Sequence, residues 1–345
     1  MMNVTLGRTS ITSPKNAFGA LPIQRISLKD AVYLLQMAAD AGFTYFDTAR
    51  AYTDSEEKMG HALAGIRDKL VIATKTGAAT PEGFWQDLHT SLRLLRTDYI
   101  DIYQLHNPAF CPKPGDGSGM YEAMLEAKEQ GLIRHIGITN HRPGVAKEAV
   151  LSGLYETLQF PFCYLASAED IELVQLCKER EVGFIAMKGL SGGLLTNAAA
   201  AYTWMTRYDN VLPIWGIQRE SELKEFIELG IAFGGQENVD SPELDAIIEK
   251  DRESLAGNFC RACGYCMPCP AGIVINQCAR MSQLIRRSPS AQWLDEKGQA
   301  MMMQIEKCLG CGHCVSKCPY GLNTPELLKQ NLEDYKNILA GKAEC

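Results

Sequence analysis

The feature that most constrains this 345-residue chain is a pair of cysteine motifs near its C-terminus. The second motif spaces its cysteines as C-x2-C-x2-C-x3-C-P, which is the arrangement that holds [4Fe-4S] clusters in bacterial ferredoxins. In the first motif the last gap is one residue shorter, but the fourth cysteine again precedes a proline. The spacing therefore predicts an iron–sulfur domain with two [4Fe-4S] clusters. Its predicted ligands are Cys260, Cys263, Cys266 and Cys269 in the first motif, and Cys308, Cys311, Cys314 and Cys318 in the second.

The spacing also indicates which cysteines share a cluster. Two-residue gaps let three thiolates converge on one cube, whereas the proline turns the fourth cysteine away from its own triad. In two-cluster ferredoxins that fourth cysteine binds the other cluster. We therefore expect Cys269 to complete the site of the second triad and Cys318 to complete the site of the first.

Zinc sites and disulfides are the alternative interpretations of these cysteines. Zinc sites use paired C-x2-C units, whereas each motif here is a triad followed by Cys-Pro. Disulfides need an oxidising compartment. The first eight residues lack the apolar core of a signal peptide, so we expect a cytoplasmic protein with reduced thiols. Cys278 matches no ligand spacing, and the isolated cysteines are expected to be ordinary thiols: Cys111, Cys163, Cys177 and Cys345.

Charge is divided unevenly along the chain. Residues 257–345 carry ten Lys and Arg against seven Asp and Glu, whereas residues 1–256 carry 24 against 34. An oxidised cluster with four thiolates has a charge of about −2, so the basic excess of the tail offsets cluster charge. The acidic body argues against a nucleic-acid partner. No apolar run reaches the roughly 18 residues that a membrane span needs, so we expect a soluble protein.

Ahead of the cysteines, short apolar segments alternate with helical ones. Strands separated by helices pair in parallel through crossovers, and eight such units in about 230 residues predict a (β/α)8 TIM barrel, an α/β fold. A doubly wound sheet is disfavoured because no G-x-G-x-x-G follows a strand. The eight strand candidates are Ala17–Leu21, Phe43–Phe46, Leu70–Thr74, Ile100–Leu105, His135–Ile138, Thr157–Phe160, Gly183–Met187 and Val211–Trp215.

These patterns divide the chain into three predicted segments. Residues 1–240 form the barrel, residues 241–256 form a connecting helix that starts with a cap and a first-turn proline, and residues 257–345 form a small, mainly helical, ferredoxin-like domain. Residues 3–15 are expected to form a polar hairpin ahead of the barrel. The loop Asn107–Ser118 follows the fourth strand, where barrel enzymes place their chemistry; it could wall a substrate pocket or be a surface excursion.

Four polar residues stand at the carboxyl ends of consecutive predicted strands. They are Asp47 and Tyr52 after the second strand, Lys75 after the third and His106 after the fourth. A free tyrosine titrates near 10, so a neighbouring lysine ammonium would lower the pKa of Tyr52 while an aspartate holds that lysine charged. A histidine could orient a carbonyl oxygen or relay its proton. Each residue alone could be structural, but together they predict a catalytic site.

Around these positions the chain closely resembles the aldo-keto reductase family. The resemblance rests on residues 42–52, on Ser55-Glu56, on the strand-end lysine and on residues 98–106. More specifically, the chain resembles the branch in which this barrel is fused to a C-terminal ferredoxin-type 4Fe-4S domain. The resemblance implies that the barrel binds NADPH across its carboxyl face and passes hydride to a carbonyl. Tyr52 would be the acid, Lys75 and Asp47 would tune it, and His106 would orient the substrate.

The same resemblance implies a nicotinamide site. Thr139, Asn140 and Gln159 stand where the family holds the carboxamide. Met187 stands where many members stack a tyrosine on the nicotinamide. The match is weaker here than at the four predicted catalytic residues.

The expected phosphate and adenine contacts match only in part. Lys188 and the glycine-rich residues up to 193 could cradle pyrophosphate through backbone N–H groups, although such a turn is equally a structural device. Gly216 matches the family, whereas Trp215 replaces a usual proline and Phe226 stands where an adenine-contacting asparagine is expected. Arg219 is the evident partner for a 2′-phosphate, so the choice between NADP(H) and NAD(H) stays open.

The two halves of the chain leave three functional hypotheses. The first is a nicotinamide-dependent oxidoreductase for a small carbonyl or alcohol, whose clusters are structural or regulatory; the intact catalytic set favours it. The second is an electron-transfer reductase whose clusters exchange electrons with a redox protein partner through a flavin or redox substrate. Flavins convert hydride into single electrons, and the barrel loops could hold FMN. The third is a non-catalytic iron–sulfur module on a relic barrel, which loss of a catalytic residue would have supported.

Overall fold

The computed structural model describes residues 2–344 apart from 234–238, 240, 256–258 and 288–290. The chain divides into two compact units. The first comprises Met1–Gly189 and Ala198–Ser241, and the second comprises Leu190–Asn197 and Pro242–Cys345. An eight-residue loop from the middle of the sequence therefore belongs to the C-terminal unit, which the sequence did not indicate.

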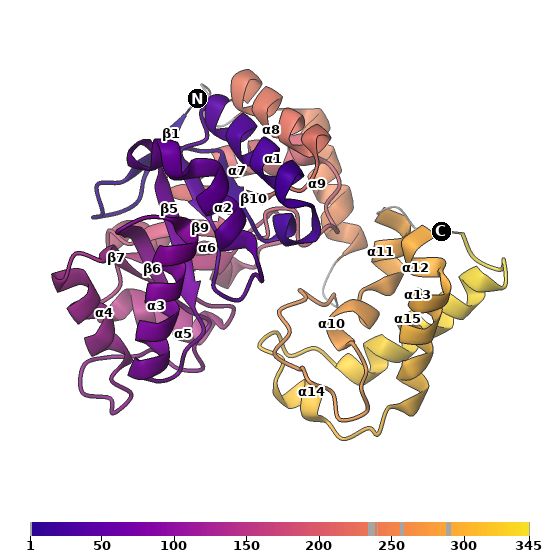
Figure 1. The fold of residues 1–345 in the computed structure, drawn as a ribbon. Helices are drawn as coiled ribbons and strands as arrows, with labels where there is room; N and C mark the ends of the chain where they lie inside the picture. Colours follow the sequence, from indigo (N-terminus) through magenta and orange to yellow (C-terminus); the bar gives the residue numbers. More distant parts are fainter. Residues whose placement is uncertain (1, 234–238, 240, 256–258, 288–290, 345) are drawn as a thin grey trace. The chain divides into compact units, whose positions relative to one another are not determined.

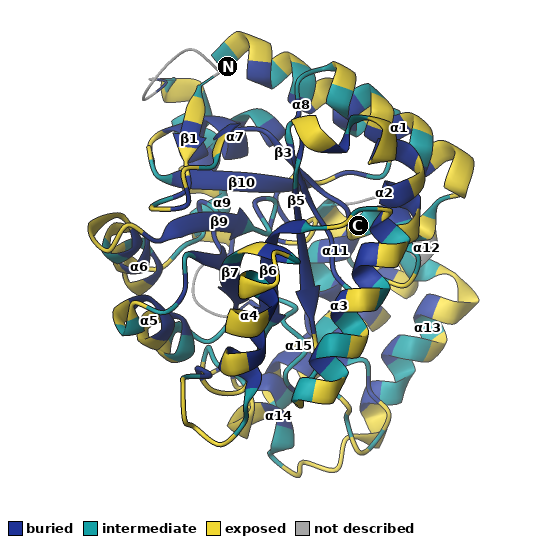
Figure 2. Ribbon diagram, turned by 60° about the vertical axis from the view of Figure 1, so that its left-hand side comes forward, coloured by how far each residue is buried: buried dark blue, intermediate teal, exposed yellow. Residues whose placement is uncertain are grey.

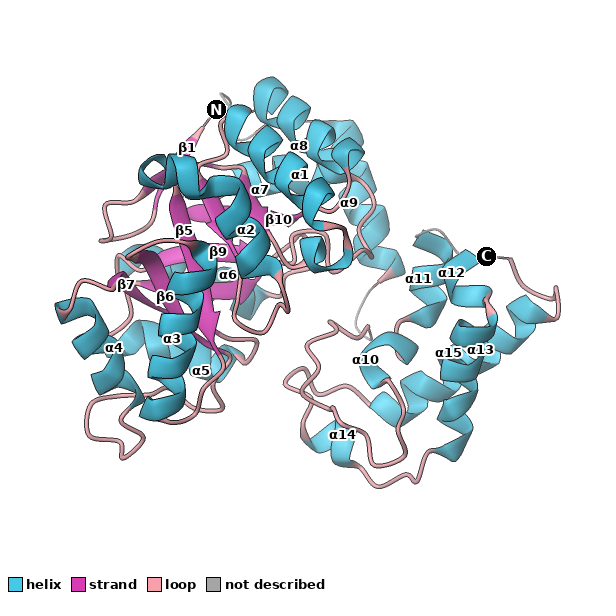
Figure 3. Ribbon diagram, in the orientation of Figure 1, coloured by secondary structure: helices cyan, strands magenta, loops and turns pink. Residues whose placement is uncertain are grey.

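In the described part of the first unit, eight parallel strands close into a barrel, and this confirms the predicted TIM-barrel fold (Figure 3). The strands follow one another around the barrel in chain order, and β10 pairs with β3 to close it. Each predicted strand overlaps an observed one. The strands are β3 (Ala17–Gly19), β4 (Tyr45–Asp47), β5 (Val71–Thr76), β6 (Ile100–His106), β7 (Ile133–Thr139), β8 (Thr157–Pro161), β9 (Gly183–Met187) and β10 (Val211–Gly216).

Helices connect the strands, and serine caps begin two of them. Ser27 caps α1 by accepting a hydrogen bond from the backbone of Asp30, and Ser167 forms a full capping box with Asp170 at the start of α6. The helices are α1 (Leu28–Asp40), α2 (Ser55–Leu63), α3 (Pro81–Leu95), α4 (Met120–Glu129), α5 (Pro143–Ser152), α6 (Ala168–Glu179), α7 (Ala198–Thr206) and α8 (Glu220–Phe233), with 3-10 turns η1 (Pro22–Arg25) and η2 (Ala64–Lys69).

The amino end of the barrel is closed by the predicted hairpin, whose strands β1 (Asn3–Thr5) and β2 (Thr12–Pro14) pair antiparallel. Val4 and Leu6 from this hairpin are buried in one apolar cluster with Tyr45, Ile102 and other inward-facing strand residues. The barrel strands are buried along most of their length, as the dark blue ribbons in Figure 2 show. Because this end is apolar and filled, the polar chemistry is left to the carboxyl ends of the strands.

The second unit contains helices but no strand among its described residues, as predicted (Figure 1). Its core packs Ile273, Met302, Leu328 and Tyr335, and the Tyr335 hydroxyl donates to the carbonyl of Trp293 at 2.7 Å. The helices are α9 (Pro242–Ser254), α10 (Ile275–Cys278), α11 (Met281–Arg287), α12 (Ala291–Leu294), α13 (Glu296–Met303), η3 (Gln304–Lys307), α14 (His313–Ser316) and α15 (Thr324–Leu339). No helix in the described part of the chain is long and apolar enough to cross a membrane.

Close packing of α2 against α3 predicts a specific sensitivity to substitution. Gly60 is buried in α2, and a Cβ atom there would lie 2.0 Å from the carbonyl oxygen of Leu94. Gly60→Ala should therefore lower the free energy of unfolding of the barrel by about 2 kcal/mol, since the helices must move apart. The matched control is Gly65→Ala, because Gly65 is exposed and its Cβ would meet no atom within 4 Å. Urea unfolding measures both variants, and equal stability of the two would contradict the predicted packing.

Candidate functional site

A buried ion pair lies at the carboxyl ends of β4 and β5. The Nζ atom of Lys75 donates to Oδ1 of Asp47 at 2.6 Å and to the backbone carbonyl of Thr48 at 2.6 Å. Lys75 is fully buried and Asp47 is 2 % exposed. Neighbouring parallel strands place the two residues side by side, since Asp47 pairs in register with Ala73, two residues before Lys75. A buried charge pair of this kind persists only when both partners are held in place.

Tyr52 and His106 complete the cluster that the sequence predicts. The ring centroid of Tyr52 lies 5.4 Å from Nζ of Lys75 and 5.9 Å from the ring centroid of His106, which meets it edge to face. His106 is the last residue of β6, and Tyr52 lies in the loop between β4 and α2. The structure therefore brings all four predicted catalytic residues together at one end of the barrel.

Burial is the largest cause of the pKa shifts in this cluster. The pKa of Tyr52 is raised by burial and, to a lesser extent, by the negative charge of Asp47. Burial also lowers the pKa of Lys75, against the opposing effect of Asp47. The net shift of the Tyr52 pKa is therefore upward, not downward as expected from a neighbouring lysine alone, because desolvation by burial is its largest cause. Tyr52 is a protonated phenol at neutral pH, which suits a proton donor.

His106 is neutral for a similar reason. Burial and the nearby charge of Lys75 lower the pKa of His106 to about 3. A neutral imidazole can donate one hydrogen bond and accept another. His106 can therefore orient a carbonyl oxygen without carrying a charge of its own.

Two glutamines form a polar chain that leads to Asp47. Nε2 of Gln104 donates to Oε1 of Gln159 at 2.9 Å, and Nε2 of Gln159 approaches Oδ1 of Asp47 at 3.4 Å. Gln159, predicted as a nicotinamide contact, is thus also a neighbour of the ion pair. Gln104 was missed by the sequence analysis. Its signal was a polar side chain two residues before His106 in the same strand, and hence on the same face.

The residues predicted to contact the nicotinamide carboxamide lie near one another, but they differ in whether their side chains already have hydrogen-bond partners. Thr139 pairs in register with Gln159 across β7 and β8, and both residues are buried. The side chain of Asn140 is already engaged: its Nδ2 donates to the carbonyl of Pro108 at 2.9 Å, and its Oδ1 accepts from two backbone N–H groups. In this arrangement Asn140 shapes the loop after β7 and ties it to the loop after β6.

His141 is a further polar residue of this region that the sequence analysis did not single out. Burial lowers the pKa of His141 to about 3, and the charge of Lys188 adds to that shift. His141 lies in the short loop between β7 and α5, at the carboxyl end of its strand. The only signal in the sequence was its position three residues after the predicted strand His135–Ile138.

An aromatic stack occupies the position where the resemblance implies a proline and an adenine-contacting asparagine. The ring of Trp215 stacks on Phe226 with centroids 4.4 Å apart, and a Cβ on Gly189 would lie 2.5 Å from the Trp215 ring. Met187 is half-buried at the end of β9, Lys188 has a positive φ of 59°, and Gly216 is exposed. Trp215 and Phe226 thus replace the proline and the asparagine that the resemblance implies. Met187, Lys188 and Gly216 are close to this stack in sequence.

Arg219 is held at the start of α8. Its Nε donates to Oε1 of Glu222 at 2.9 Å, and the Arg219 side chain is 61 % exposed. Glu222 also accepts the backbone N–H groups of Gln218 and Arg219. A 2′-phosphate would have to compete with this carboxylate for the guanidinium group.

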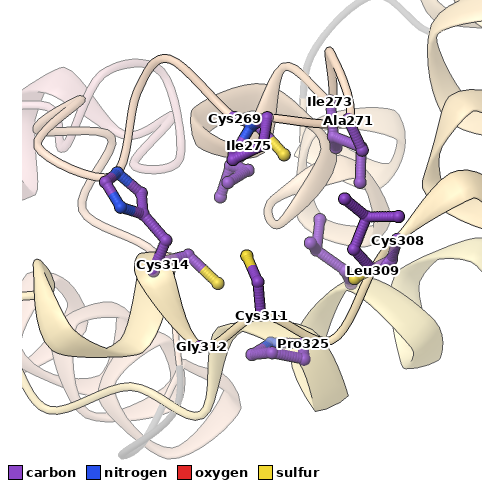
Figure 4. A pocket seen from close by; sticks show the side chains of 13 residues that line it. Cys269, Ala271, Ile273, Ile275, Cys308, Leu309, Cys311, Gly312, Cys314 and Pro325 are labelled. Atoms are coloured by element: carbon purple, nitrogen blue, oxygen red, sulfur yellow. The ribbon is translucent and has the colours of Figure 1, made fainter.

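Cysteines of both motifs line one cavity in the second unit. Its walls include Cys269 together with Cys308, Cys311 and Cys314, and otherwise mainly apolar residues such as Ile273, Ile275 and Leu328. Figure 4 shows the sulfur atoms of Cys269, Cys311 and Cys314 directed toward a common space. Four thiol donors around an apolar hollow fit a [4Fe-4S] cluster. The fourth cysteine of the first motif is thus placed with the triad of the second, in the arrangement that the spacing predicts.

The other four predicted ligands also influence one another. Burial raises the pKa of Cys260, and the neighbouring charges of Cys263 and Cys318 add to this shift. Burial together with the charges of Cys260 and Cys263 raises the pKa of Cys266 to about 12. Cys260 and Cys266 are buried, whereas Cys308 and Cys311 are exposed. One predicted cluster therefore lies deeper in the unit than the other.

The spacing of these thiols differs from that of a mononuclear metal site. Among the described residues, no three His, Cys, Asp or Glu side chains are close enough to share a single metal ion. A zinc ion holds its thiolates at about 2.3 Å from one centre, whereas a four-iron cube keeps its thiolates farther apart at its corners. The donor set therefore fits the cube better than zinc.

Two family models match this sequence. The model of the aldo/keto reductase family covers residues 15–201, and the model of the 4Fe-4S dicluster domain covers residues 259–323. The uncharacterized oxidoreductase YqkF of Bacillus subtilis is 32 % identical over 180 residues, which cover 48 % of this chain and 58 % of that protein. Methylglyoxal reductase DkgA of Yersinia pestis is 32 % identical over 166 residues, which cover 47 % and 55 %. The chain thus spans little more than half the length of these relatives.

Solved structures share the barrel. The holo form of an aldo-keto reductase from Bacillus halodurans matches with a TM-score of 0.62 and 22 % identity, covering 73 % of this chain and 96 % of that one. An aldo-keto reductase from Klebsiella pneumoniae in complex with NADPH matches with a TM-score of 0.61 and 22 % identity, covering 72 % and 94 %. Because the first family model spans more than half of the sequence, the chain belongs to the aldo/keto reductase family and carries a C-terminal 4Fe-4S domain.

Proposed function

We propose that this protein transfers hydride between NADP(H) or NAD(H) and a small carbonyl or alcohol. The observation that carries the proposal is the convergence of Tyr52 and His106 on the buried Lys75–Asp47 pair. The methylglyoxal reductase activity named for one relative and the NADPH bound by one structural neighbour support it. The family membership makes the protein an oxidoreductase, and the geometry supports this particular reaction.

The residues of the cluster have distinct parts in such a reaction. Bound nicotinamide supplies or accepts the hydride. Negative charge then develops on the carbonyl oxygen, and Tyr52, which is protonated at neutral pH, donates its proton to that oxygen. The Lys75 ammonium opposes the charge left on the phenol oxygen, and Asp47 holds the ammonium in place. Neutral His106 donates a hydrogen bond that orients the carbonyl. Alcohol oxidation follows the same steps in reverse.

The cofactor contacts form part of the proposal. Thr139 and Met187 are the last residues of β7 and β9, Gln159 lies within β8, and all three would flank the nicotinamide. Lys188 and Gly216 would approach the phosphates, and Arg219 would bind a 2′-phosphate after releasing Glu222. Asn140 would contribute mainly by shaping its loop, because its side-chain groups already have partners.

The exposed cluster site favours a second candidate function. Cys308 and Cys311 are exposed, and Leu309 between them is 70 % exposed. The segment from Lys307 to Lys317 contains no acidic residue. An accessible thiolate-bound cluster with an apolar and basic surround could exchange single electrons with an acidic redox protein. In this alternative, a flavin such as FMN or a redox substrate in the barrel would convert between hydride and single electrons.

The first prediction concerns the proton donor. Tyr52→Phe should lower kcat for carbonyl reduction by at least about 100-fold, because positioned general acids contribute factors of roughly 10² to 10⁴. Nicotinamide affinity and visible cluster absorbance should stay unchanged. The control is Tyr33→Phe, since Tyr33 is 53 % exposed on α1 and should leave kcat unaltered. Retained turnover in Tyr52→Phe, measured with a test aldehyde, would refute Tyr52 as the acid.

The second prediction concerns the shared cavity. Cys269→Ala and Cys311→Ala should each remove one cluster and about half of the iron, because the two residues would serve the same cube. The double variant should lose no more iron than either single variant. Cys278→Ala is the control, since Cys278 is buried in the same core but matches no ligand spacing. Additive iron loss in the double variant would show that Cys269 and Cys311 serve different clusters.

A further inference from the structure

The loop that carries Tyr52 is held at its base by a chain of hydroxyl groups. This loop, residues 48–54, joins β4 to α2. The Thr48 hydroxyl donates to the Ser55 hydroxyl at 2.9 Å, and Ser55 donates in turn to the carbonyl of Ala20 at 3.0 Å. Because Thr48 opens the loop and Ser55 begins α2, this chain joins the two ends of the loop. The position of Tyr52 within the loop depends on further contacts.

Arg50 fastens the middle of the loop. Its backbone N–H donates to the carbonyl of Lys75 at 3.0 Å, and its guanidinium group forms an ion pair with Glu56. The Arg50 side chain is 22 % exposed, whereas the residues on either side of Tyr52 are exposed. Arg50 therefore attaches the chain to two fixed groups only two residues before Tyr52.

Glu56 is a buried carboxylate whose donors come from three different elements. Its side chain is fully buried. Its Oε2 accepts from Arg50 in the loop, and its Oε1 accepts from the hydroxyl groups of Thr74 on β5 and Ser91 on α3, each at 2.7 Å. A buried carboxylate requires charge-assisted hydrogen bonds in place of its water, and removal of one partner from such a pair is costly. The buried carboxylate thus holds Arg50 in place.

The strand β5 connects this ion pair to the lysine of the site. Side chains alternate between the two faces of a strand. Lys75 points into the barrel, where it meets its carboxylate partner, and the preceding Thr74 points outward to Glu56. Because Arg50 is bonded to the Lys75 carbonyl and to Glu56, the loop is aligned on the same strand end that carries the ammonium. The Tyr52 ring and Nζ of Lys75, 5.4 Å apart, thereby share one support.

We propose that Arg50 and Glu56 are positioning residues for proton transfer, whose ion pair holds the Tyr52 loop against the end of β5. The inference rests on the proposed function, in which Tyr52 donates a proton to a carbonyl oxygen. The pair takes no proton itself and acts through Tyr52. Without the pair, the loop samples other positions, so the phenol is less often within hydrogen-bond distance of the oxygen that it protonates.

The first test separates the proton-transfer step from binding. Arg50→Gln should lower kcat for aldehyde reduction about 10- to 100-fold, because misplacement of a reacting group by about 1 Å can cost the larger of these factors. KM for the aldehyde and Kd for NADPH should stay near the wild-type values. Arg50→Lys keeps a cation at this position and should recover most of kcat. An unchanged kcat in Arg50→Gln would overturn the proposal.

The second test asks whether the two residues act together and through Tyr52. Glu56→Gln keeps the side-chain volume and an acceptor for the two hydroxyl groups, and it should lower kcat as much as Arg50→Gln does. The double variant should lose no more than either single variant, because both remove the same interaction. In a Tyr52→Phe background, Arg50→Gln should cause no further loss. Losses that multiply in either combination would show that the pair acts elsewhere, which contradicts the proposal.

Two controls separate positioning from general stability. Ser91→Ala removes a donor to the same carboxylate from α3 and leaves Arg50 paired, so it should lower stability in urea but keep kcat near the wild-type value. Arg134→Gln removes another arginine–carboxylate pair, to Asp101 at 3.0 Å, from a residue on β7. It should leave kcat unaltered. A loss of kcat in Ser91→Ala as large as that in Arg50→Gln would show that kcat follows stability alone, and would sink the positioning role.

A third measurement needs no substrate and separates this inference from the proposed function. The backbone N–H groups of Tyr52 and Ser55 donate to the carbonyls of Ala49 and Tyr52 at 3.0 and 2.8 Å. Hydrogen exchange at these two amides should become at least about tenfold faster in Arg50→Gln, because the loop opens more easily, and should be unchanged in Arg134→Gln. If the wild-type protein reduced no aldehyde, the proposed function would fail, but faster exchange would still support the tether. Equal exchange rates would refute the tether whatever the activity.

Discussion

The buried pair of Lys75 and Asp47 is the interaction on which the barrel site depends. Both charges are removed from water, so each requires a partner at close range. The parallel pairing of β4 and β5 supplies it, and the Thr48 carbonyl and the glutamine chain through Gln159 satisfy further hydrogen-bonding capacity. The fold is needed to hold this pair, and the pair in turn gives Tyr52 a fixed cation beside its ring. In an isolated loop, the same side chains would be hydrated by water.

The pKa values in this cluster depend more on burial than on which ionisable residues are neighbours. Lysine beside tyrosine suggests a phenolate when the two are considered alone. In the folded protein the aspartate compensates the lysine, and desolvation dominates, so the pKa of Tyr52 rises. The same effect lowers the pKa of His106 to about 3. As a result, Tyr52 is a neutral acid and His106 is a neutral hydrogen-bond donor, and both lie beside the fixed Lys75 ammonium. This arrangement favours proton donation to an oxygen that becomes negative only during the reaction.

The sequence predicts those features that follow from periodicity and strand ends. All eight strands were located because short apolar runs recur between capped helices, and Asp47, Lys75 and His106 meet because parallel strands end on one face. Features that depend on tertiary contacts were not predictable. The amide of Asn140 is used by its own loop, Arg219 is held by Glu222, and residues 190–197 belong to the second unit. Each outcome depends on a partner that no local pattern identifies.

The two units differ in how their buried charges are compensated. The barrel contains both signs in its own side chains, so the Lys75–Asp47 pair is complete in the polypeptide alone. The second unit buries Arg280 as well as several thiols, and no carboxylate among its described residues pairs with that arginine. Its charge balance is completed only when thiolates and cluster are present. Cluster binding should therefore contribute directly to the folding free energy of this unit, whereas the barrel should keep its site geometry independently of iron.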